Sequence, residues 1–152
     1  MPEKIVVASD HAGFPLKEKV KAHLQARGLE VEDLGTHSLD SVDYPDFAHR
    51  LAEEIVSGRF ARGVLVCGTG IGVSIAANRH PGVRAALAWN EETARLSRQH
   101  NDANVLALGN RTLDHDFALR VLDAWLDTPF EGGRHARRVA RIEVDPSGNA
   151  DC

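Results

Sequence analysis

The stretch VLVCGTGIGVSIAANRH, residues 64–80, decides the fold. An aliphatic run ends at Cys67, three glycines follow in alternate positions (Gly68, Gly70 and Gly72), and a segment of helical composition comes after them. A strand that leaves through a glycine turn into a helix is the repeating unit of α/β folds. Ligands of such folds bind beyond the carboxyl ends of the strands, so the residues from Cys67 onward are the first candidates for a functional site.

The same alternation of strand and helix patterns recurs along the chain. Short β-branched and aliphatic runs, which predict strands, occupy residues 4–9, 29–34, 63–67, 83–88 and 104–108. Apolar residues at helical spacing lie between or after them, in segments near 16–28, 47–58, 71–78, 90–99 and 117–125. This order predicts a Rossmann-like, three-layer α/β/α fold with a five-stranded parallel sheet, followed by a short C-terminal basic helix in residues 132–144.

Length and composition indicate one ordinary globular domain. The chain has 152 residues, of which 43% are hydrophobic and 26% charged, and we expect a single domain over 1–145 with a flexible tail over 146–152. The net charge of −4 argues against nucleic-acid binding. No signal peptide or long apolar run is recognisable, so we expect a cytoplasmic protein with no membrane contact.

The two cysteines, Cys67 and Cys152, predict neither a disulfide framework nor a metal site, because no cysteine or histidine pair has metal-ligand spacing. Cys152 ends the tail. Cys67 precedes a turn into a helix, where backbone amides and the helix dipole favour a thiolate. Two interpretations stay open: Cys67 is a base or nucleophile beside an anion-binding loop, or it is a small buried residue at a strand end.

Familiar glycine-loop motifs do not fit. The dinucleotide pattern GxGxxG fails at Val73, and the loop lacks the Gly-Lys-Ser/Thr of nucleotide hydrolases. A phosphatase-like thiolate loop needs an arginine where Val73 stands, and a nucleophile elbow needs a glycine where Leu65 stands. An anion-binding loop preceded by a thiol remains.

Other polar residues gather near predicted strand ends. Asp10 and His11 follow the first strand, His100 and Asn101 lead into the fifth, and Arg111 follows it. Imidazoles move protons near neutral pH, although a lone histidine is more often structural.

A basic segment lies near the end of the chain, at Arg134, His135, Arg137, Arg138 and Arg141. In a helix, Arg134 and Arg138 share one face, as do Arg137 and Arg141, and either pair suits a phosphate. A solvated basic face is the alternative.

Four segments in this order resemble the ribose-5-phosphate isomerase B family, which also includes galactose-6-phosphate isomerase subunits. They are SDHAG (9–13), CGTGIGVSIAAN (67–78), RLSRQHNDANVLALGNR (95–111) and GGRHARRV (132–139). The resemblance covers about residues 4–143. It implies interconversion of ribose 5-phosphate and ribulose 5-phosphate, a step of the pentose phosphate pathway, by proton transfer through a cis-enediolate without metal or organic cofactor.

The resemblance also implies roles for single residues. Cys67 corresponds to the base that moves the carbon-bound proton, and His100 to the acid/base that opens the sugar ring. Asp10 and Thr69 are expected to take part in catalysis. The residues expected to bind substrate are Asp10, His11, Gly68, Thr69, Gly70, Ile71, Gly72, Asn101, Arg111, Arg134 and Arg138. Arg134 and Arg138 match the family's phosphate clamp, which leaves Arg137 and Arg141 as the solvated pair.

Family members are dimers, some pairing further to tetramers, and each active site uses both subunits. We therefore expect a homodimer. The alternatives are an isomerase for allose 6-phosphate or galactose 6-phosphate, a non-catalytic sugar-phosphate sensor and, last, a thiol hydrolase acting through Cys67. Tyr44 either shapes the sugar pocket or caps the second helix.

Overall fold

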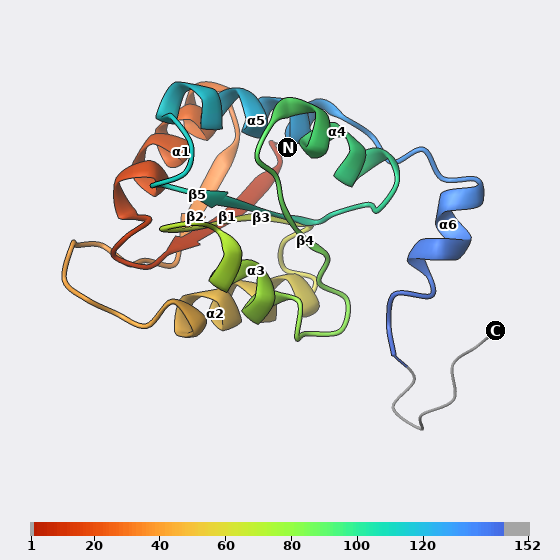
Figure 1. The fold of residues 1–152 in the computed structure, drawn as a ribbon, viewed down its shortest axis with the longest axis horizontal. Coiled ribbons are helices and arrows are strands. Elements are labelled where there is room, and N and C mark those ends of the chain that lie inside the picture. The colour runs from red at the N-terminus through yellow and green to blue at the C-terminus, as the bar shows by residue number, and fades with distance from the viewer. Residues whose placement is uncertain (1, 145–152) are drawn as a thin grey trace.

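Five parallel strands form one sheet in the order β2-β1-β3-β5-β4 (Figure 1). The computed structural model describes residues 2–144, so the predicted tail 146–152 and Cys152 lie outside the described residues. The strands are β1 (Lys4–Ser9), β2 (Glu30–Asp33), β3 (Arg62–Cys67), β4 (Ala85–Leu87) and β5 (Val105–Gly109). The helices are α1 (Phe14–Ala26), α2 (Tyr44–Val56), α3 (Ile71–Ala77), α4 (Glu91–Gln99), α5 (His115–Asp127) and α6 (Arg134–Val139).

Helices cover both faces of the sheet, which confirms the predicted three layers. Figure 1 shows α1, α4 and α5 on one face and α2 and α3 on the other. Helix α6 lies apart from these layers, on the side where the chain passes from α4 into β5. No helix within residues 2–144 is both long and apolar enough to cross a bilayer.

The central strands are aliphatic because both of their faces are buried. Val64 and Val66 of β3 point into the core beneath α1 and α5, whereas Leu65 and Cys67 point into the core beneath α2 and α3. Successive side chains of a strand alternate between faces, so a doubly covered strand needs an unbroken apolar run. The Cys67 side chain therefore leaves the sheet on the α2–α3 side.

The fourth predicted strand and the sixth predicted helix are shorter in the structure than their sequence patterns. Strand β4 covers 85–87 of the predicted 83–88, because this edge strand pairs only with β5, through three residue pairs. Helix α6 covers 134–139 of the basic segment 132–144. The two glycines before α6, Gly132 and Gly133, have φ of +66° and +55°, and this left-handed backbone prevents an earlier helix start.

The turn after β3 depends on Gly70. This residue caps α3 with φ of +78°, and a β-carbon there would lie 2.6 Å from Leu87 Cδ1. Only glycine fits such a left-handed and crowded position. The turn starts α3 directly after the strand and keeps the Cys67–Gly72 loop close to the sheet.

Strand order reverses between β1 and β3, because β2 lies on one side of β1 and the rest of the sheet lies on the other. A crevice at such a reversal is the usual ligand site of an open parallel sheet. The loops that leave β1 and β3 carry Asp10, His11 and the glycine turn. The fold thus places these predicted site residues at the expected position.

Candidate functional site

Cys67 is the last residue of β3, and its thiol lies under the turn that follows it. The residue is 5% exposed, and the amide of Gly70 donates a hydrogen bond to its Sγ over 3.1 Å. An N–H group aimed at sulfur stabilises negative charge there. Cys67 is thus a buried residue at a strand end, and the donor on its sulfur is compatible with a base or nucleophile, which stays a prediction.

The loop after β5 lies against the loop after β3. The amide of Asn110 donates to the carbonyl of Cys67 over 2.9 Å, and the amide of Arg111 donates to the carbonyl of Gly68 over 2.8 Å. The Arg111 side chain passes beside Gly68, where an added β-carbon would be 3.5 Å from its Nη1 atom. An exposed guanidinium thus stands next to the glycine turn, as a cation for a bound anion.

Asp10 and His11 lie in the neighbouring loop after β1. Asp10 is 6% exposed and accepts a hydrogen bond of 2.9 Å from the amide of Gly13. Nδ1 of His11 accepts a hydrogen bond of 3.1 Å from the amide of Val42. Because an accepting Nδ1 carries no proton, the neutral ring holds its proton on Nε2, which is then a donor.

Two backbone amides of the predicted anion-binding loop already donate to atoms of the loop itself. The Gly70 amide points at the sulfur, and the Ile71 amide donates to Thr69 Oγ1 over 3.1 Å. Within residues 2–144, no hydrogen bond from the amides of Gly68 and Thr69 to another protein group is observed. The Gly72 amide at the start of α3 likewise has no partner among these residues, so the amides of Gly68, Thr69 and Gly72 are donors that an oxyanion beside Cys67 could use.

Tyr44 covers the far end of the glycine turn. A β-carbon on Gly72 would lie 2.5 Å from Tyr44 Cε1, so the ring packs directly on that glycine. Tyr44 is also the first residue of α2 and is 41% exposed. It therefore borders the site and begins the second helix, so both roles weighed from the sequence are compatible.

The remaining predicted residues form a second group. His100, Asn101, Arg134 and Arg138 line one cavity of about 390 Å³ between the end of α4 and α6. Arg137 and Arg141 do not line it, in keeping with the predicted division of the arginines by helical face. A wider cavity of about 670 Å³ beside β4 contains only Asn101 from the predicted set.

The Cys67 group and the His100 group lie at opposite ends of the parallel strands. Cys67 pairs in register with Gly109 at the carboxyl ends of β3 and β5, and Gly63 pairs with Val105 at the amino ends. These four residue steps span about 13 Å. His100 precedes Val105 in the chain and therefore lies beyond the amino ends of these strands. One chain therefore does not bring His100 and the arginine helix to Cys67.

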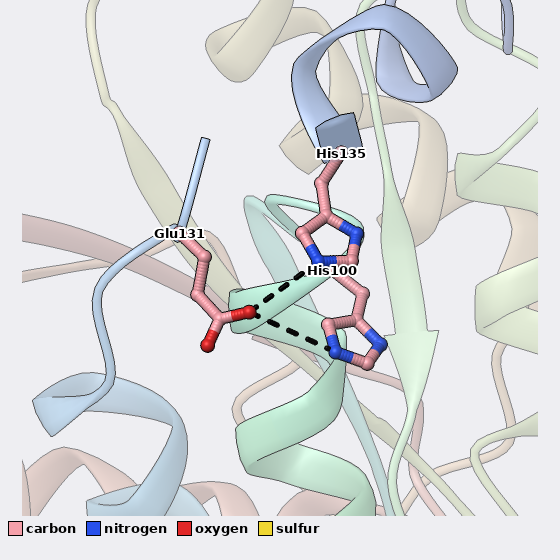
Figure 2. A group of neighbouring side chains, drawn as sticks. All are labelled: His100, Glu131 and His135. Carbon is pink, nitrogen blue, oxygen red and sulfur yellow. Dashed lines mark ion pairs between the residues drawn. The ribbon is translucent and has the colours of Figure 1, made fainter. Parts of the chain in front are cut away.

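His100 has two close neighbours, shown in Figure 2. His135 of α6 stacks on it, with ring centroids 4.3 Å apart and planes 12° apart. Glu131 Oε1 lies 3.9 Å from His100 Nε2 and 3.4 Å from His135 Nε2. The three ligand atoms lie within 4.8 Å of one another, but stacked rings cannot both direct in-plane lone pairs at one ion. The present arrangement favours a proton-handling group over a metal centre.

No sequence pattern pointed to Glu131, and His135 was expected to be only a member of the basic segment. Their only sequence signal is an acid and a histidine four residues apart across Gly132 and Gly133, which no helical or strand pattern supports. The contact of Val42 with His11 was likewise invisible, since it joins two loops.

A buried ion pair supports the loop that carries Val42 and leads to Tyr44. Lys17 Nζ lies 2.7 Å from both carboxylate oxygens of Asp33, and the Lys17 side chain is completely buried. Asp33 also accepts a hydrogen bond of 2.9 Å from the amide of Gly35. Burial alone would raise the pKa of Asp33, but the hydrogen bonds from Lys17 and Gly35 outweigh it, so the pKa is lowered.

Comparison with known proteins gives consistent matches. The family model described as Ribose/Galactose Isomerase matches residues 5–142. Ribose-5-phosphate isomerase B of Escherichia coli is 48% identical over 140 residues, which are 92% of this chain and 94% of that protein. The structure of ribose-5-phosphate isomerase B from Clostridium thermocellum superposes with a TM-score of 0.90 at 54% identity, covering 91% of this chain and 94% of that one. The corresponding structure from Thermotoga maritima has a TM-score of 0.90 at 53% identity, covering 92% and 97%.

Proposed function

The chain belongs to the ribose/galactose isomerase family, and from that membership we propose that it interconverts ribose 5-phosphate and ribulose 5-phosphate. The observation that carries the proposal is the Gly70 amide on the Sγ of Cys67, at the sheet position where α/β folds bind ligands. The reaction moves a proton between C1 and C2 with no net oxidation. It therefore needs a base and charge stabilisation, both of which the loop offers.

In this mechanism the Cys67 thiolate removes the proton from C2 of the open-chain aldose. The negative charge passes to O1 and forms a cis-enediolate. The proton of the O2 hydroxyl then moves to O1, and the proton held by Cys67, or one from solvent, is returned to C1 as the carbonyl forms at C2. The free amides of Gly68 and Thr69 and the Nε2 proton of His11 are donors for the oxygens that become charged. Preorganised donors of this kind lower a barrier by several kcal/mol, roughly 3 per donor.

The second group of residues performs the remaining tasks. His100 opens the furanose ring before the carbon proton is moved, Asn101 contacts the sugar, and Arg134 and Arg138 hold the phosphate. Their common cavity supports this assignment. Arg111, on the Cys67 side, supplies the third cation.

A homodimer would unite the two groups. The Cys67 group of one subunit would face the His100 group of its partner, and the two-fold axis would generate two equal sites. Exposed apolar side chains favour self-association: Ile71 and Ile75 lie one turn apart on α3 and are 51% and 61% exposed, and Trp89 after β4 is 59% exposed. A cytoplasmic location stays a prediction.

The experiment that tests the function measures aldose-to-ketose conversion by the purified protein with ribose 5-phosphate, allose 6-phosphate and galactose 6-phosphate in parallel. We expect the highest kcat/KM with ribose 5-phosphate. Preference for either hexose phosphate would replace the substrate while keeping the reaction class. Binding of ribose 5-phosphate without conversion would show a sugar-phosphate sensor instead.

A further inference from the structure

The ring of His100 is supported by a neighbouring side chain that is not one of the predicted site residues. The His135 ring stacks on it at 4.3 Å, and His135 is only 7% exposed. A buried ring has little freedom to move, so the plane of the stacked His100 ring is fixed as well. The His100 side chain is 43% exposed, which leaves its other side open to the cavity.

Glu131 adds a charge to this stack. Its Oε1 atom faces the Nε2 atoms of both rings (Figure 2). A carboxylate near one imidazole nitrogen favours the tautomer with the proton on that nitrogen. Nδ1 of His100 is then the unprotonated atom. The distance of 3.9 Å to His100 exceeds a hydrogen bond, and such contacts in free enzymes often tighten when substrate binds.

The segment that carries Glu131 is fastened to the same helix end as His100. The amide of Glu131 donates to the carbonyl of Gln99 over 3.2 Å, and Arg98 Nε donates to the carbonyl of Thr128 over 3.2 Å. The left-handed Gly132 and Gly133 then turn the chain so that His135 returns over His100. These contacts hold the segment 128–131 against the end of α4 and so keep the three side chains together.

We propose that Glu131 and His135 are positioning residues for His100 in ring opening, an inference that rests on the proposed function. His135 sets the plane of the His100 ring, and Glu131 keeps its proton on Nε2. Nδ1 then takes the proton of the sugar's O1 hydroxyl, the C1–O4 bond breaks, and the imidazolium returns a proton to O4. Protons balance in this step. His135 also lines the cavity, but in the role proposed here it acts through the His100 ring, as Glu131 does.

The test separates ring opening from carbon-acid chemistry. Ribulose 5-phosphate cannot close a five-membered ring, because its C5 oxygen carries the phosphate. Exchange of its C1 proton with D2O, followed by NMR, therefore needs Cys67 but no ring opening. Conversion of ribose 5-phosphate needs both. The two rates are measured for Glu131→Ala, Glu131→Gln, His135→Phe and His135→Leu, with His100→Ala for comparison and Glu53→Ala as an exposed control on α2.

We expect Glu131→Ala and His135→Leu to lower kcat/KM for ribose 5-phosphate about tenfold or more, which is less than the roughly 10²–10⁴-fold effect of losing a general acid/base altogether. Exchange at C1 should stay within about threefold of wild type. His135→Phe keeps a stacking ring and should retain more activity than His135→Leu. Glu131→Gln should resemble Glu131→Ala, because it lacks the charge. Equal loss of both rates, or loss of neither, would overturn the proposal. A wild-type protein inactive in both assays would overturn the proposed function instead.

Discussion

The amide of Gly70 donates a hydrogen bond of 3.1 Å to the Sγ of Cys67, the sulfur on which the proposed chemistry depends. The turn that creates this contact requires glycine at position 70, since the residue has φ of +78°. The same short loop thus fixes the geometry of the backbone and the electrostatic environment of the thiol. A base placed in this way acts on the transition state far more than on bound substrate.

Replacing Cys67 by alanine tests the base directly. Cys67→Ala should lower kcat for ribose 5-phosphate by at least about 10³-fold, because no other group in the loop takes the carbon proton. Phosphate-ester affinity, measured by calorimetry, should stay within a few fold. Conversion close to the wild-type rate would remove Cys67 from the mechanism. A covalent acyl or phosphoryl adduct on Cys67 of the wild type would instead indicate hydrolase chemistry.

Mixing two inactive variants tests whether the site uses both subunits. Cys67→Ala and His100→Ala homodimers are mixed, exchanged under mild denaturant and assayed. A hybrid dimer holds one site with both substitutions and one with neither. With random exchange about half of the dimers are hybrids, so activity should recover to roughly one quarter of wild type. No recovery after proven subunit exchange would mean that the residues act in the same chain or that the dimer differs.

Most of the fold was predictable because buried parallel strands are continuous aliphatic runs. The pattern of Val64 to Val66 needs no knowledge of distant residues, and the shared face of Arg134 and Arg138 follows from helical spacing alone. The separation of His100 from Cys67, in contrast, could not be predicted from the sequence. It depends on strand order and on which end of β5 each loop meets, neither of which a local pattern contains.

The burial of Lys17 in the core is a second feature that a local sequence pattern does not predict. Next to Leu16 in an amphipathic helix, it has the sequence appearance of a solvated lysine, yet its side chain is fully buried. Its partner Asp33 lies on β2, and only the packing of α1 beside that strand brings them together. Glu131 likewise acquires its neighbours from the turn at Gly132 and Gly133. Tertiary contacts of single side chains, which no local pattern encodes, were the part that the sequence could not predict.

The division of the arginines predicts different kinetics for neighbouring variants. Arg138→Ala should raise KM for ribose 5-phosphate about tenfold or more with a smaller effect on kcat, because a charged hydrogen bond to phosphate contributes roughly 1.5–3 kcal/mol. Arg137→Ala is the matched control, since Arg137 is exposed and does not line the cavity. Unchanged KM for Arg138→Ala, or equal effects of the two changes, would contradict the clamp.

The Lys17–Asp33 pair predicts how stability responds to acid. Because the pKa of Asp33 is lowered in the folded state, its contribution is complete above its unfolded value of about 3.9 and is lost as pH falls through the folded value. Glu3 and Asp123 also have lowered pKa values and act in the same direction.

Asp33→Asn should destabilise the protein by about 3–5 kcal/mol at pH 7, since it leaves Lys17 buried without its counter-charge. Urea unfolding at pH 7, 5 and 3.5 should show this difference narrowing at the lowest pH. Asp127→Asn, at an exposed partner of Arg27, is the control and should cost at most about 1 kcal/mol. A deficit for Asp33→Asn that stays constant over this range would mean that the ion pair does not control the acid response.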